Sequence, residues 1–128
     1  MLKGEMEGKP LFAKVALGPD VGRMAGHPWR IDVSVEIQEP NDDGLPEKKE
    51  LNLLQDLDDR LNEAVAARTS SIPWTSRTFD GSRTTSLYVA EPLSLREAVG
   101  PIAAAAGYEA SVVIDYDPRW QEYRKFVQ

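Results

Sequence analysis

Residues 29–37, WRIDVSVEI, alternate between apolar and polar side chains, and this pattern constrains the fold more than any other part of the chain. Alternation with a period of two predicts a β-strand with two different faces. The apolar face consists of Trp29, Ile31, Val33, Val35 and Ile37. Because such a face must be buried against a second layer, the chain folds around a sheet that is covered on at least one side.

The rest of the fold has to be stabilised by packing alone, because the 128 residues include no cysteine. Disulfides and cysteine-ligated metals are thereby excluded. A chain of this length buries enough surface for one unaided core. We therefore expect a single domain over residues 1–128.

Three further segments before residue 91 have clear patterns. Residues 10–17 alternate and predict a strand, which we expect to pair antiparallel with residues 29–37. Pro46 marks the start of a long helix, whose apolar stripe consists of Leu51, Leu54, Leu57, Leu61 and Val65. Asp80-Gly81 joins two strand-like runs and favours a two-residue hairpin turn.

The hairpin register predicts which side chains enter the core. A regular two-residue loop sets Trp74 opposite Leu87 on the core face and leaves Arg77, Phe79 and Tyr88 on the other face. We expect one shared core, with these members: Ile31, Val33, Val35, Leu54, Leu57, Leu61, Trp74, Leu87, Ile102 and Val112.

A second helix, a last strand and a terminal helix complete the predicted order. Ser94 and Glu97 have capping-box spacing, Pro101 is expected to kink or interrupt the helix, and Gly107 ends it. Residues 109–116 predict a strand. The fold class is therefore α+β: a ferredoxin-like (split βαβ) antiparallel sheet with an extra N-terminal strand and a C-terminal helix.

The C-terminal segment DYDPRWQEYRKFVQ admits two interpretations. Asp117-Pro118 is a suitable N-cap and first-turn pair, and Trp120, Tyr123 and Val127 share one helix face, with Phe126 beside them. That face either clamps the helix to the domain or forms an exposed docking surface for a partner or ligand.

Candidate sites are few. Glu39, Asn41, Asp43, Gly44 and Glu50 nearly match a calcium loop, but a strand precedes them and a turn followed by a helix start explains them. Asp115 and Asp117 suit either a metal or a structural role, in which Asp117 caps the helix and Asp115 pairs with an arginine. His27 is the only histidine. We therefore expect no metal and no cofactor, and the catalytic residues, if any, are unknown.

The charge of the chain bears on its partners. With 15 Lys and Arg against 21 Asp and Glu, the net charge is −6, which disfavours nucleic acid and acidic membrane surfaces. The N-terminal residues lack an apolar stretch, so we expect a cytoplasmic protein.

Several motifs together resemble a bacterial family of proteins, the domain-of-unknown-function family 695. They are HPWRIDVSVEI, DGLPEKKEL, TFDGSR followed by Tyr88, and the terminal DPRWQEYRKF. That family is loosely grouped with the ribonuclease E activity regulator B proteins, which are acidic ferredoxin-like domains that bind a protein partner. The resemblance implies a fold and a regulatory role, and it carries over no catalytic residue.

We expect a non-enzymatic protein-interaction or regulatory module that binds a protein partner and forms a homodimer through the edge of the strand over residues 11–17. The alternative is a small-molecule-binding domain or hydrolase that uses the sheet face away from the helices. The candidate surface residues are Arg77, Phe79, Arg83, Tyr88, Asp115, Asp117, Trp120 and Tyr123.

Overall fold

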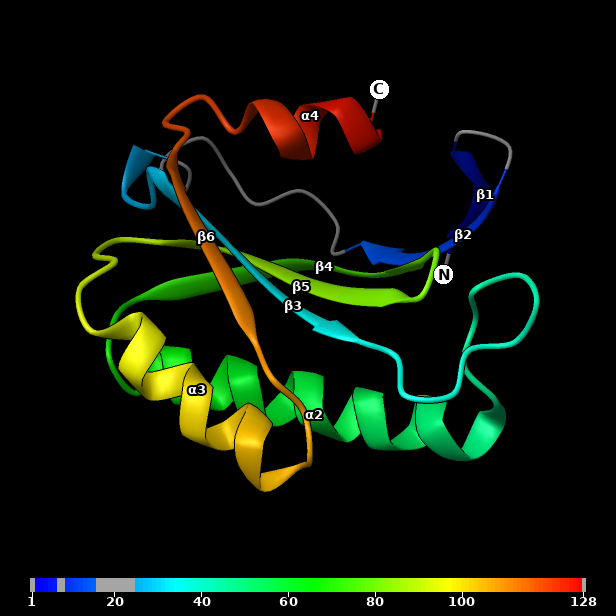
Figure 1. Ribbon diagram of the computed structural model, residues 1–128. Coiled ribbons are helices and arrows are strands. Elements are labelled where there is room, and N and C mark those ends of the chain that lie inside the picture. The colour runs from blue at the N-terminus through cyan, green and yellow to red at the C-terminus, as the bar shows by residue number, and fades with distance from the viewer. Residues whose placement is uncertain (1, 7–8, 16–24, 128) are drawn as a thin grey trace.

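The computed structural model describes residues 2–6, 9–15 and 25–127 and shows an α+β fold (Figure 1). Its elements, in chain order, are β1 (Leu2–Met6), β2 (Lys9–Val15), β3 (Trp29–Glu36), α2 (Lys48–Ala66), β4 (Ser71–Phe79), β5 (Ser82–Val89), α3 (Leu95–Ala105), β6 (Ser111–Tyr116) and α4 (Gln121–Val127). The predicted α+β class and the C-terminal helix are confirmed.

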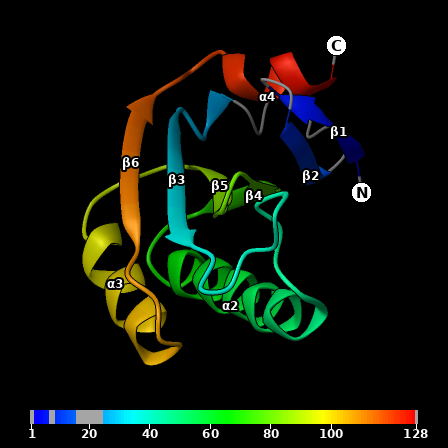
Figure 2. The ribbon, with the colours of Figure 1, turned by 45° about the vertical axis from the view of Figure 1, so that its right-hand side comes forward.

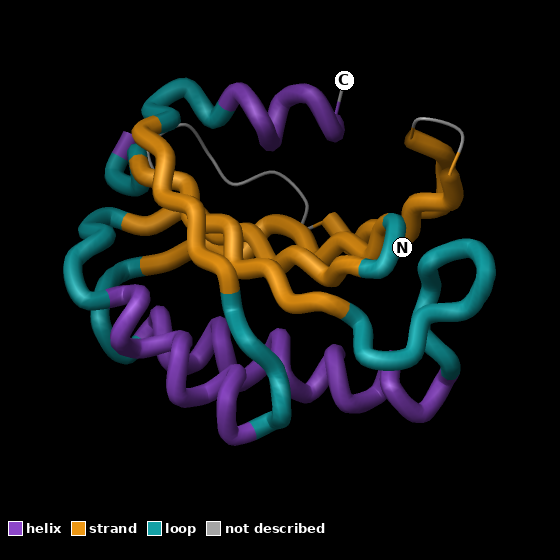
Figure 3. Tube along the Cα trace, in the orientation of Figure 1, coloured by secondary structure: helices purple, strands orange, loops and turns teal. Residues whose placement is uncertain are grey.

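The strands form one sheet between two helical layers. The sheet order is β1-β2-β4-β5-β3-β6, and every neighbouring pair is antiparallel. Helices α2 and α3 lie on one face of the sheet, and α4 lies on the opposite face (Figures 1 and 3). After a 45° turn, α3 is seen beneath β6 and β3, and α2 beneath β5 and β4 (Figure 2).

The prediction for the N-terminal strand was partly wrong. A strand does form over Lys9–Val15, but it pairs with β4 and not with β3. A further strand, β1, pairs with its other side, so β2 has neighbours on both sides. Its edge is therefore not the open one that we expected to pair two copies. Leu17, the last residue of the predicted alternation, lies outside the described residues.

The two ends of α3 test the capping signals that the sequence predicts. At its C-terminus the Tyr108 N–H donates to the carbonyl of Ala103 and the Gly107 N–H to that of Ala104, with Gly107 at φ +87°, which is a Schellman motif. At its N-terminus Ser94 has φ +63° and makes no side-chain capping bond, so the predicted capping box was wrong. Pro101 is accommodated within the helix and does not interrupt it.

The main core lies between the sheet and helices α2 and α3. Alternate residues of β3 meet the leucine stripe of α2, and Leu54 and Leu61 are buried as predicted. Ile102 and Val112 are partly buried and pack against this core. Burial of these side chains is the dominant stabilising term, at about 1.5–3 kcal/mol for each large aliphatic residue.

Trp74 does not join this core, so the prediction of one shared core was wrong. The Asp80-Gly81 turn forms as expected, with Phe79 opposite Ser82, but the register shifts between Pro73 and Thr75. Proline has no N–H for the ladder, and bulges are among the few places where a strand tolerates it. The shift aligns Ile72 with Tyr88 and moves Trp74 into a second apolar cluster.

A short loop packs against the hairpin turn and requires glycine. Gly44 has φ +76°, and its carbonyl accepts a 2.8 Å hydrogen bond from the Gly81 N–H. A Cβ at Gly44 would lie 2.8 Å from the Cα of Asp80, which is closer than atoms can approach.

Gly44→Ala is therefore expected to destabilise the protein by about 2 kcal/mol or more, because the change combines an unfavourable φ with a backbone clash. Gly100→Ala is the matched control. Gly100 lies within α3, where an added Cβ meets nothing within 4 Å. That change should stabilise the protein by about 0.5–1 kcal/mol. Equal denaturation midpoints for the two variants would contradict the packing of this loop.

Candidate functional site

Helix α4 covers a second apolar cluster on the sheet face away from α2 and α3. The indole of Trp120 stacks on the ring of Tyr88, with a centroid distance of 4.0 Å and an interplanar angle of 8°. Tyr123 contacts Trp120 edge-on at 5.6 Å and Trp74 at 5.7 Å. Trp120 is fully buried, which confirms the burial that the clamp interpretation requires. Phe126 and Val127 belong to the same predicted face, but their side chains lie outside the described residues.

The turn before α4 directs Trp120 onto the sheet. The helix begins at Gln121, three residues later than Pro118 predicts, and Trp120 itself has φ +53°. The Trp120 Nε1–H donates to the carbonyl of His27 at 2.9 Å, and the ring Nε2 of His27 lies 2.8 Å from the Ser70 hydroxyl. His27 therefore supports the docking of α4.

Asp117 joins the start of α4 to strand β5. Its carboxylate accepts a hydrogen bond from the Tyr88 hydroxyl at 2.7 Å and one from the Gln121 N–H at 2.9 Å. Burial alone would raise the pKa of Asp117, but these hydrogen bonds, together with the nearby charge of Arg30, hold it below its usual value. Burial and the same contact raise the pKa of Tyr88. The Asp117 carboxylate does accept N–H groups of the first turn of α4, but the prediction that Asp117 is the N-cap residue was wrong, because the helix begins at Gln121.

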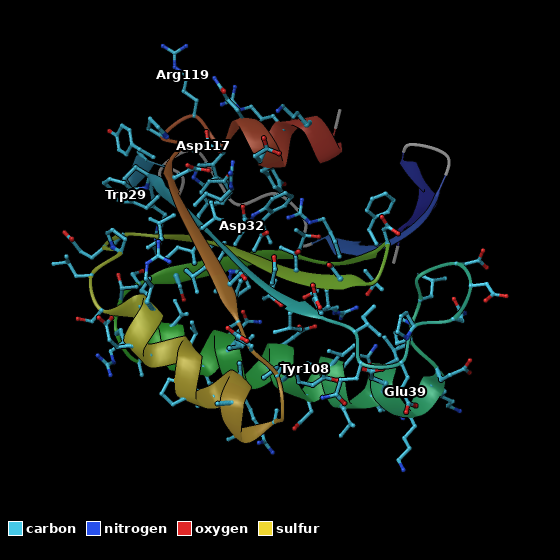
Figure 4. All side chains as sticks on the ribbon, in the orientation of Figure 1. Trp29, Asp32, Glu39, Tyr108, Asp117 and Arg119 are labelled. Atoms are coloured by element: carbon cyan, nitrogen blue, oxygen red, sulfur yellow. The ribbon has the colours of Figure 1, made fainter. Side chains whose placement is uncertain are left out.

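Arg30 is the centre of an ion-pair network beside the aromatic cluster. Its guanidinium lies 2.6 Å from Asp115 and 3.1 Å from Asp32, and it approaches Asp117 and Glu122 at 3.8 and 3.7 Å. Burial lowers the pKa of Arg30, but its acidic neighbours, Asp32 first among them, raise the pKa overall. The predicted pairing of Asp115 with an arginine is confirmed. Asp32 and Asp117 both lie on the α4 side of the sheet (Figure 4).

Arg77 extends this network toward β4. Its guanidinium donates to the Ser86 hydroxyl at 3.0 Å and lies 3.8 Å from Asp32, while Ser86 donates to Asp32 at 2.5 Å. Burial lowers the pKa of Arg77, and the charge of Asp32 opposes that effect. The guanidinium carbon is also 5.8 Å from the Trp74 ring, within the range of a cation–π contact. Arg77 thus links the polar network to the aromatic cluster.

The remaining predicted residues do not gather at one place. Arg83 lies on the opposite face, buried against α2, where it pairs with Asp58 at 2.6 Å. Placing Arg83 on the same face as Tyr88 was therefore wrong, since the alternation from Leu87 directs Arg83 toward the helices. Phe79 is half-buried at the far end of β4. The structure brings together five of the predicted set: Arg77, Tyr88, Asp117, Trp120 and Tyr123, with Asp115 at their margin.

The calcium-like loop uses its oxygen atoms internally. The Asn41 side-chain oxygen accepts from the N–H groups of Asp43 and Leu45. Glu50 is buried and accepts from two backbone N–H groups and from the Tyr108 hydroxyl at 2.7 Å. These bonds, opposed by burial, lower the pKa of Glu50. Among the described residues no cluster of three or more acidic or histidine side chains is arranged to hold a metal ion.

The last strand, β6, ends the sheet, because in the strand order of the described residues only β3 neighbours it. Two hydrogen bonds define the direction of its backbone groups. The Asp117 N–H donates to the Pro28 carbonyl at 2.7 Å and continues the ladder with β3. The Val112 carbonyl instead accepts from the Arg96 guanidinium of α3 at 2.6 Å. Because backbone direction alternates along a strand, the even-numbered residues of β6 point their N–H and C=O groups outward.

Exposed apolar side chains lie along the open edge of β6. Val113 is 51% exposed and Tyr116 is 64% exposed, and the Tyr116 ring lies 4.9 Å from that of Trp29. The outward backbone groups are those of Val112, Ile114 and Tyr116. Sequence reasoning selected Asp115 of β6 but not the edge of the strand, although its run of apolar residues, VVI, was a usable signal.

These features define a small α+β domain whose second sheet face is closed by its own C-terminal helix. The chain belongs to the DUF695 family, described as a family of unknown function, whose model matches residues 4–128. No curated protein and no solved structure matches the chain. Within the described residues, no helix has the length and apolar character that crossing a bilayer requires.

Removal of the Trp120 side chain tests the clamp. Trp120→Ala is expected to destabilise the protein by about 3–5 kcal/mol, as truncation of a buried aromatic residue does. Leu93→Ala, at a side chain that is 75% exposed, should cost less than about 0.5 kcal/mol. Urea denaturation provides the measurement. An unchanged midpoint for Trp120→Ala would show that α4 is not docked.

The low pKa of Asp117 predicts an acid-sensitive contribution to stability. A carboxylate whose pKa is depressed by folding stabilises the protein above its unfolded pKa of about 3.9, and that stabilisation is lost as pH falls through the folded pKa. Asp117→Asn should therefore lower the urea midpoint at pH 7, and the gap from wild type should narrow below about pH 4. Asp59→Asn, on the exposed face of α2, should have little effect at pH 7. A difference between the urea midpoints of wild type and Asp117→Asn that stays constant from pH 7 to below about pH 4 would contradict the low pKa of Asp117.

Proposed function

We propose that the protein is a non-enzymatic interaction module that binds a partner polypeptide along the open edge of β6. The observation that carries this proposal is the outward row of backbone groups on β6, flanked by exposed Val113 and Tyr116. An edge strand offers main-chain hydrogen bonds to an added strand, and adjacent side chains supply specificity.

The polar face beneath α4 is less suited to chemistry. Its carboxylates are engaged by Arg30, by Tyr88 or by N–H groups, and these contacts attach α4 to the sheet. A catalytic acid or base is normally poised with a perturbed pKa and access to substrate. Asp117 and Tyr88 do have perturbed pKa values, but both are buried and hydrogen-bonded to each other, which favours binding at the edge over hydrolysis on the face.

A regulatory role and a cytoplasmic location form part of this proposal. Support comes from the net charge of −6, which disfavours nucleic acid and acidic membranes as partners and leaves a protein partner as the best candidate. We also propose that this protein is similar to the ribonuclease E activity regulator B proteins. We also class the fold as ferredoxin-like; in support, the connectivity from β3 to β6 is βαββαβ and the order is β4-β5-β3-β6.

Ile114→Pro tests the use of the edge. Proline removes the outward N–H of residue 114 and leaves the ladder with β3 intact, so the fold should persist. Immobilised wild-type protein should capture a partner from native cell extract, identified by mass spectrometry, and the proline variant should lose it.

Leu93→Ser is the control, because Leu93 is exposed and lies outside β6. It should capture the same partner as wild type. Thermal unfolding establishes that all three proteins are folded. Equal capture by the three would exclude the β6 edge as the binding site.

A further inference from the structure

We infer that the occupant of the β6 edge is a second copy of this chain, paired antiparallel through β6 about a two-fold axis at Ile114. This inference rests on the proposed function, since it names the partner for the same edge. It also replaces the edge of β2 with that of β6 as the dimer contact, because β2 lies between β1 and β4.

The backbone of β6 permits few self-pairings. Outward-pointing residues of one copy must face outward-pointing residues of the other, so the axis passes through a residue and not between two residues. Near the middle of the strand it can pass through Val113, Ile114 or Asp115. An axis at Asp115 sets that carboxylate against its own copy. An axis at Val113 sets Glu109 against Asp117 of the second copy. Like charges that face each other directly are destabilising, which disfavours both registers.

An axis at Ile114 avoids these conflicts. On the helix side of the sheet, Ile114 faces Ile114 of the second copy, and Val112 faces Tyr116 of the second copy. On the other side, Val113 faces Asp115 of the second copy. No like charges are opposed within the ladder, so the strand is complementary to itself, as a two-fold interface requires.

One side chain already contacts the outward side of β6. Arg96 is compatible with this pairing, since the Val112 carbonyl that it contacts has a second lone pair for an incoming N–H. A strand of six residues makes a small interface, so we expect a weak dimer that depends on protein concentration.

Charge variants at Val113 test the register through sedimentation velocity. Val113→Lys places a cation opposite Asp115 of the second copy and should lower the dimer dissociation constant roughly threefold to tenfold, because each dimer contains two such pairs. Val113→Asp opposes like charges and should raise that constant by at least as much. Val113 also neighbours Asp32 in its own chain, so thermal unfolding of both variants is measured first.

A cysteine on the axis gives an independent test, because the chain has no cysteine of its own. Opposed residues of a hydrogen-bonded pair lie about 5.5 Å apart between Cα atoms, within disulfide range. Ile114→Cys should therefore form a covalent dimer under mild oxidation, although Ile114 is partly buried. Leu93→Cys, at a side chain that is 75% exposed and so more accessible to random collision, should remain monomeric.

The outcomes separate this inference from the proposed function. A wild-type protein that stays monomeric at high concentration, together with no preferential cross-linking of Ile114→Cys, would overturn self-pairing. If Ile114→Pro still abolished capture of another protein, the β6 edge would remain a binding site for that protein. If the edge variants kept both the capture of a partner and the dimer, both proposals would be refuted.

Discussion

The stack of Trp120 on Tyr88 is the contact on which the second half of the structure depends. The sheet has apolar side chains on both faces, and helices α2 and α3 cover only one of them. Without α4, the side chains of Ile72, Trp74 and Tyr88 would face water at a substantial cost in free energy. The aromatic stack, fixed by Asp117 and by the carbonyl of His27, closes that face with a helix of seven residues.

The sheet face beneath α4 and the sheet edge at β6 have different roles. The charged groups near α4 hold one another and the helix in place, so their chemistry is used within the fold. Within the described residues, the outward backbone groups of β6 make only one such internal contact, the bond from the Arg96 guanidinium to the Val112 carbonyl. The features that point to binding therefore lie at the edge of the sheet, whereas most of the polar network lies on β3, β4 and β5.

Much of the fold could be predicted because its signals are local. Alternation in residues 29–37 specifies a strand, Asp80-Gly81 specifies a turn, and the leucine stripe specifies the buried face of α2. The position of Trp74 could not be predicted by counting from the turn, because the bulge at Pro73 shifts the register by one residue. Proline within a strand was the available signal for that bulge.

The site was harder to predict, since it depends on contacts distant in sequence. The pairing of Arg30 with Asp115 spans 85 positions, and the burial of Trp120 requires that Tyr88 faces away from α2. Which strand ends the sheet is likewise a property of topology, and the alternation within β2 or β6 carries no information about it. The C-terminal helix was the exception, because its aromatic spacing already indicated a buried face.

Amide hydrogen exchange along β6, followed by NMR in dilute protein, tests the central claim most directly. If the edge is open, exchange alternates along the strand: the amides of Val113 and Asp115, which donate to β3, exchange slowly, and that of Ile114 exchanges fast. Slow exchange at Ile114 equal to that at Val113, in protein too dilute to associate, would show that the edge is closed within a single chain and would contradict the account.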